Sequence, residues 1–161
     1  MGAMLKGHKY IVQEVAFSPD GRSLVSASAD RSVRIWRLRD GSSKVLPVIG
    51  SPRAFTSVAF SPDGRYIGAG NFDRSLWIWD SRTRRLVAKW WGHTFSVSCT
   101  EFTPDGKGLI SGSSDNTVKY WDLGLLGNRR GVSTVNEEQS LPLVRSLLGH
   151  DVRYICLLSH P

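Results

Sequence analysis

Histidine, serine and aspartate recur together in this sequence, and these residue types form metal sites and nucleophilic triads in other proteins. Two sets share one order and a spacing of 22 residues between histidine and aspartate: His8, Ser28 and Asp30, then His93, Ser113 and Asp115. His150 stands at the next corresponding position. Because each histidine belongs to a different repeat unit, we expect internal hydrogen bonds rather than a metal site or a catalytic triad.

The other candidates for chemistry are explained in the same way. Cys99 and Cys156 share one repeat position, and neither belongs to a Cys-x-x-Cys pair. Three aspartates belong to hairpin turns rather than to a catalytic pair: Asp20, Asp63 and Asp105. No glycine-rich phosphate loop is present. The sequence therefore predicts no enzyme, no cofactor and no metal, and its two cysteines favour a reducing, intracellular compartment.

The elements that position these residues follow from an internal repeat. Three markers recur after 43 and then 42 residues: Phe-Ser/Thr-Pro-Asp-Gly from 17, 60 and 102, aspartate at 30, 73 and 115, and tryptophan at 36, 79 and 121. In the first unit, a bulged strand through Val12, Val15 and Phe17 is followed by strands over 23–28, 33–37 and 44–49. Four antiparallel strands in 42–43 residues without helical periodicity predict an all-β fold of propeller blades.

The residues at the unit boundaries resemble a known family. Gly7-His8, the turn aspartate and Trp79-Asp80 are similar to the Gly-His and Trp-Asp signature of WD repeats. The resemblance implies a buried hydrogen-bonded set of His8, Ser28, Asp30 and Trp36 in the first unit, and of His93, Ser113, Asp115 and Trp121 in the third. The second unit keeps Asp73 and Trp79, but Ser51 and Asn71 replace the histidine and the serine. We therefore expect more apolar packing in that unit.

Within the family, residues 28–36 and 72–80 and a polar insertion over 124–142 resemble the fungal Tup/Groucho-type transcriptional corepressors. The likeness covers residues 7–158. It implies a nuclear or cytoplasmic interaction scaffold that holds DNA-bound repressors and chromatin proteins. Those corepressors also carry an N-terminal coiled coil and more blades, which this sequence does not contain.

The repeat also predicts the domain boundaries. Blade one covers 1–49 with an N-terminal strand at 3–6, blade two 50–91, blade three 92–148, and the first strand of an incomplete blade 149–161. Propellers typically close with four to eight blades, so three blades leave apolar flanks exposed. We expect a homo-oligomeric ring, of two chains in preference to three; a self-assembling fragment without a partner is the alternative.

Large side chains in the predicted loops indicate a partner-binding face. Tyr10, Arg53 and Phe95 occupy one repeat position, and Phe72 precedes the turn aspartate of the second unit. Exposed aromatic and arginine side chains are common interface anchors. The net charge of +7 keeps nucleic acid or an acidic surface as an alternative partner. We find neither a signal peptide nor an apolar run near the roughly 18–20 residues of a membrane span.

Overall fold

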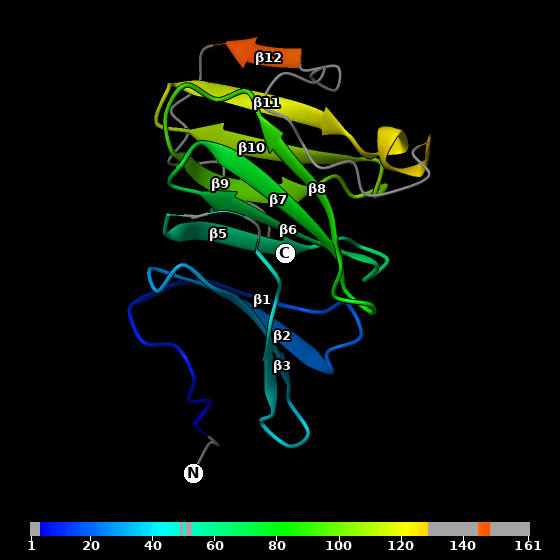
Figure 1. Cartoon of the computed structure of the whole chain (residues 1–161). Helices are drawn as coiled ribbons and strands as arrows, with labels where there is room; N and C mark the ends of the chain where they lie inside the picture. The colour runs from blue at the N-terminus through cyan, green and yellow to red at the C-terminus, as the bar shows by residue number, and fades with distance from the viewer. Residues whose placement is uncertain (1–3, 49, 51–52, 129–144, 149–161) are drawn as a thin grey trace.

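A computed structural model of the chain describes residues 4–48, 50, 53–128 and 145–148. Three four-stranded antiparallel sheets follow one another, from the blue sheet near the N-terminus to the yellow sheet at the far end (Figure 1). Within the described ranges there is no α-helix, and no helix is long and apolar enough to cross a membrane. One 3-10 helix, η1 (Leu123–Asn128), follows the third sheet's third strand.

Each sheet keeps its strands in chain order. The first sheet contains β1 (Val12–Phe17), β2 (Ser23–Ser28), β3 (Val33–Arg37) and β4 (Ser43–Val45). The second contains β5 (Phe55–Phe60), β6 (Tyr66–Asn71), β7 (Ser75–Asp80) and β8 (Leu86–Trp91). The third contains β9 (Val97–Phe102), β10 (Gly108–Ser113), β11 (Thr117–Asp122) and β12 (Arg145–Leu148). The all-β blade architecture predicted from the repeat is confirmed.

The turn between the first two strands of each sheet explains why the chain reverses there. Gly21, Gly64 and Gly106 adopt φ values of 65°, 70° and 68°, a left-handed conformation that glycine takes without steric cost. In the first turn the Gly21 amide donates to the Ser18 carbonyl at 2.8 Å. The register shifts near the start of β1, where the sequence predicted a bulge.

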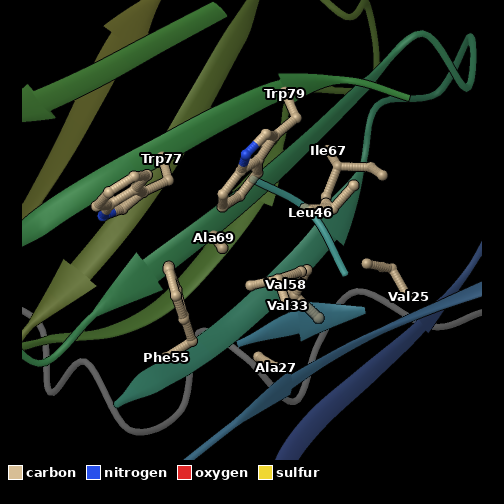
Figure 2. Packing of buried hydrophobic residues seen from close by; sticks show 10 residues of the cluster. All are labelled: Val25, Ala27, Val33, Leu46, Phe55, Val58, Ile67, Ala69, Trp77 and Trp79. Carbon is tan, nitrogen blue, oxygen red and sulfur yellow. The ribbon is translucent and has the colours of Figure 1, made fainter. Parts of the chain in front are cut away.

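The sheets pack face to face through apolar side chains. Figure 2 shows the cluster between the first two sheets, where side chains of both blades meet. Its members are Val25, Ala27, Val33 and Leu46 from the first blade, and Phe55, Val58, Ile67, Ala69, Trp77 and Trp79 from the second. A second cluster joins the second and third sheets, where Trp90 stacks on Trp121 with ring centroids 5.8 Å apart.

Side chains also join the innermost strands of neighbouring sheets. The Val58 amide on β5 donates to Glu14 Oε2 on β1 at 2.7 Å. Thr56 Oγ1 donates to the Val97 carbonyl at 2.6 Å, near the start of both β5 and β9. The turns that follow these strands also lie side by side, because a Cβ at Gly64 would lie 3.6 Å from Pro19 Cδ and one at Gly106 would lie 3.9 Å from Pro62 Cδ. With β5 and β9 also starting together, β1, β5 and β9 run in the same direction. The first strand of each sheet forms what we call its inner edge, because no further strand of that sheet pairs with it. Side chains of the neighbouring blade bond backbone groups along this edge.

Two predicted strands are wrong in extent. Residues 4–6, the described part of the expected N-terminal strand, form no strand, and β12 holds the fourth-strand place of the third sheet for which they could have competed. The strand expected over 44–49 is only Ser43–Val45, since Pro47 has no N–H to extend the ladder. Of the insertion 124–142, residues 124–128 belong to η1. The rest of the insertion, Ser51, His150, Cys156 and the predicted strand after 149 lie outside the described residues.

Candidate interaction surface

A hydrogen-bonded chain of side chains fixes one end of the first sheet. His8 Nδ1 lies 2.9 Å from Asp30 Oδ2, and His8 Nε2 lies 2.6 Å from Ser26 Oγ. Ser26 Oγ also accepts from Trp36 Nε1 at 2.7 Å. The Lys9 amide donates to Asp30 Oδ2 at 2.9 Å, which ties the loop before β1 to the turn between β2 and β3.

The third sheet repeats this arrangement. His93 Nδ1 lies 2.8 Å from Asp115 Oδ2, and His93 Nε2 lies 2.7 Å from Ser111 Oγ. Trp121 Nε1 donates to Ser111 Oγ at 2.7 Å. A neutral imidazole with its proton on Nδ1 satisfies every group, because it donates to the carboxylate and accepts from the serine hydroxyl.

The bridging hydroxyl is therefore not the one expected from the sequence. Ser26 and Ser111 hold the place that was assigned to Ser28 and Ser113. In the sheet register Trp36 pairs with Leu24, and Ser26 is two residues further along the same face. Ser28 lies beyond reach of the indole, and its hydroxyl instead donates to the Ile11 carbonyl at 2.9 Å.

Electrostatics keep the two aspartates ionised. Burial raises the pKa of Asp30, but hydrogen bonds from the Ser32 hydroxyl and the Lys9 amide outweigh it and hold that pKa far below its usual value. The Thr117 hydroxyl and the Thr94 amide have the same effect on the pKa of Asp115, also against burial. Burial lowers the pKa of His93, more than the neighbouring carboxylate raises it. The ionised Asp115 and the neutral His93 therefore form a hydrogen-bonded pair with a structural role.

The described part of the chain offers no cluster of three or more histidine, cysteine or acidic side chains that could hold a metal ion. Ser111 is fully buried, and its hydroxyl already bonds both the indole and the imidazole. A hydroxyl enclosed in this way is not accessible to a substrate. Cys99 is buried on β9.

The second sheet has apolar packing at the position of the bridging serine. Ala69 stands where the other sheets have Ser26 and Ser111, and it is fully buried. Trp77 and Trp79 stack with centroids 5.9 Å apart, and Trp79 Nε1 donates to the carbonyl of Pro47 in the first blade at 2.7 Å.

Lys89 takes the place beside the turn aspartate that histidine has in the other two sheets. Its Nζ lies 3.8 Å from Asp73 Oδ2 and 4.2 Å from the centroid of the Trp77 ring. Ser75 links the pair to the indole, since its hydroxyl donates to Asp73 and accepts from Trp77 Nε1. Asp73 and Trp79, which the sequence placed in one set, therefore bond different partners.

The three aspartate turns form one end of the molecule. The amides of Ala29, Phe72 and Ser114 donate to the carbonyls of the loops before β1, β5 and β9, at 2.9, 2.9 and 3.0 Å. Since these inner strands run in the same direction, all three turns lie at the same end of the sheets. We call this end the Asp-turn face; it comprises turns 29–31, 72–74 and 114–116 and the adjacent loop residues 8–11, 53–54 and 93–96.

The four predicted partner-binding residues all lie on the Asp-turn face, distributed over the three blades. Tyr10, Phe72 and Phe95 are 72%, 52% and 63% exposed, and Arg53 is exposed as well. Sequence reasoning missed exposed Ile11, which follows Tyr10, and the arginines of the turns themselves. The signal for the arginines was present, because they stand where the third unit has asparagine, a residue that favours turns.

Comparison with known proteins places these blades in context. The family model "WD domain, G-beta repeat" matches residues 2–37, 44–80 and 84–122. Ribosome assembly protein 4 of Saccharomyces cerevisiae is 56% identical over 39 residues, which are 24% of this chain and 8% of that protein. Small ribosomal subunit protein RACK1 of Candida albicans is 50% identical over 38 residues, 24% of this chain and 12% of that protein.

Solved structures match over most of the chain. The structure of U3-55K superposes with a TM-score of 0.77 and 25% identity, over 92% of this chain and 42% of that one. The crystal structure of the RRP9 WD40 repeats gives the same values. The chain thus spans less than half of the solved relatives and a small part of the curated ones.

Proposed function

The chain belongs to the WD-repeat family, and on that premise we propose that it is a scaffold that holds other proteins on its Asp-turn face. The observation that supports this most is the exposure of Tyr10, Phe72 and Phe95 at one end of sheets whose tryptophans are largely buried. Burial of one such aromatic side chain in an interface contributes about 1.5–3 kcal/mol. A few such anchors carry most of the binding energy in a typical interface.

The loops that present these anchors are already ordered. Tyr10 lies next to residues whose carbonyl and amide bond the Asp30 turn, and the Phe72 amide donates to the Ala54 carbonyl. Ordering a loop on binding reduces affinity, so loops fixed beforehand favour it. WD-repeat domains are typically non-enzymatic scaffolds, which agrees with polar sets that are bonded internally.

The identity of the partner is a finer question. The likeness of residues 28–36 and 72–80 to transcriptional corepressors favours DNA-bound repressors and chromatin proteins in the nucleus of a fungus. The similarity to a ribosome assembly protein and to a small ribosomal subunit protein favours ribosomal assemblies instead. In either kind of assembly the chain would hold other proteins, and we propose only that function.

The face is tested by affinity capture from cells of the source organism, followed by quantitative mass spectrometry. The face variant carries alanine at four positions: Tyr10, Arg53, Phe72 and Phe95. A matched control replaces exposed residues away from that face with alanine: Leu38, Arg82 and Val87. We expect a set of proteins to be retained by wild type and control and lost from the face variant. Identical captured sets for both variants would contradict the proposal.

A second function, self-association, is favoured by the uncovered flank of the first sheet, meaning the face of the sheet that carries Val15 and Phe17. Phe17 on β1 is 65% exposed, whereas Phe102, at the same repeat position on β9, is 4% exposed beneath the preceding sheet. Val15 is likewise 51% exposed and its equivalent Val58 only 3%. We infer that this flank takes another blade, supplied by a second copy of the chain in a closed ring. Light scattering of a well-folded monomer at micromolar concentration would exclude the second copy.

A further inference from the structure

Two arginines on the Asp-turn face hold a backbone conformation that suits other residues better. Arg31 and Arg74 have φ values of 68° and 78°, and Asn116 occupies the same position of the third turn at 64°. Left-handed φ is unfavourable for side chains with a Cβ, and asparagine tolerates it best after glycine. Both arginines are exposed, so packing does not explain their presence.

The carboxylates of the same face do not neutralise these arginines. Asp30 and Asp115 each accept from a histidine, a backbone amide and a hydroxyl within their own blade. Asp73 accepts from Ser75 and pairs with Lys89. Across the described residues no ion pair involves Arg31 or Arg74.

The Asp-turn face carries both exposed cations and exposed apolar side chains. The cations of the face are Lys9, Arg31, Arg53 and Arg74, and its apolar side chains are Tyr10, Ile11, Phe72 and Phe95. In the first blade, Lys9 and Tyr10 lie beside the turn that carries Arg31, since the Lys9 amide bonds Asp30. In the second blade, Phe72 and Arg74 belong to the same turn.

We propose that the Asp-turn face binds an acidic protein segment with interspersed apolar residues, and that Arg31 and Arg74 determine its preference for carboxylates. The inference rests on the proposed scaffold function and names the chemistry of the partner. An interface of opposite charges speeds association and rejects partners of the wrong sign. Nucleic acid fits less well, because phosphate-backbone binding is carried by cations, whereas four of these eight side chains are apolar, and the aliphatic Ile11 cannot stack on bases.

The test exploits the asparagine of the third turn. The variant Arg31→Asn/Arg74→Asn gives the first two turns the residue that the third already has, so we expect its folding stability to be retained. The matched control is Arg84→Asn together with Arg65→Asn, which removes the same charge at the opposite end. Arg84 also has a positive φ, 60°, and follows the end of β7.

Binding of the full chain is measured by fluorescence anisotropy with three labelled twelve-residue probes. The first is a peptide in which glutamate alternates with leucine and phenylalanine, the second carries glutamine in place of glutamate, and the third is single-stranded RNA. We expect the acidic peptide to bind most tightly, and its Kd to rise roughly tenfold in the Arg31/Arg74 variant, with no change in the control.

Each unfavourable outcome is distinct. Equal weakening by both double variants would show a general effect of net charge and would overturn the assignment of Arg31 and Arg74. Tighter binding of the RNA would replace the acidic segment with nucleic acid. If the alanine face variant loses its captured proteins but the Arg31/Arg74 variant retains them all, the scaffold function is supported and the proposed acidic partner is wrong.

Discussion

Replacing Ser111 with alanine tests the reasoning about the buried hydrogen bonds. The substitution leaves Trp121 Nε1 and His93 Nε2 without the hydroxyl that lies 2.7 Å from each. A buried polar group without a partner costs about 1–3 kcal/mol. After allowance for the hydroxyl that no longer needs to be buried, we expect the free energy of unfolding to fall by about 2–4 kcal/mol.

The assay is urea unfolding followed by tryptophan fluorescence and by circular dichroism. With a urea m-value of about 2 kcal/mol/M, in the middle of the typical range, the midpoint is expected to shift down by about 1–2 M. Ser98→Ala is the matched control, because it makes the same chemical change at an exposed position of the same blade, and its effect should stay within about 0.5 kcal/mol. Equal midpoints for Ser111→Ala and Ser98→Ala would refute the assigned bridge.

Three further predictions concern pH, packing and backbone approach. Because burial lowers the pKa of His93, the unfolded chain gains its proton first, so stability in a pH series of urea unfolding should fall below about pH 6.5, and less so in His93→Gln. Phe102→Ala should cost about 3–5 kcal/mol in urea unfolding and Phe17→Ala much less, since only the former is buried. A Cβ at Gly70 would lie 2.6 Å from Val97 Cγ1, so Gly70→Ala should lower the free energy of unfolding by about 1–3 kcal/mol, as measured by thermal unfolding.

The strands could be predicted because their turns carry local chemistry. Gly21 and its two equivalents mark the first reversal of each sheet, and apolar Val33 and Ile35 on either side of Arg34 follow the two-residue period of a strand. The exception is the fourth strand of the first blade, where Pro47 ends the ladder early. Pro47 is therefore the residue from which the early end of this strand can be predicted.

The site could be predicted only in part. Sequence periodicity predicts on which face of a sheet a side chain lies, but not which residue of the neighbouring strand it contacts. Ser26 and Ser28 point to the same face, and only the sheet register shows that the indole of Trp36 meets Ser26. Lys89 was not foreseen as the partner of Asp73, since the two come from a turn and from the outer strand. The exposed aromatic residues were found because an aromatic side chain in a loop has few structural explanations.

The bond between Glu14 and the Val58 amide has a consequence for cutting or truncating the chain. That amide lies on the inner edge of β5, where an uncovered strand can template pairing with another molecule and start a fibril. A fragment that begins after the first blade would lose the Glu14 carboxylate and leave the Val58 amide on the edge of β5 without its partner. Fragments for expression are therefore better divided where this carboxylate stays with its amide.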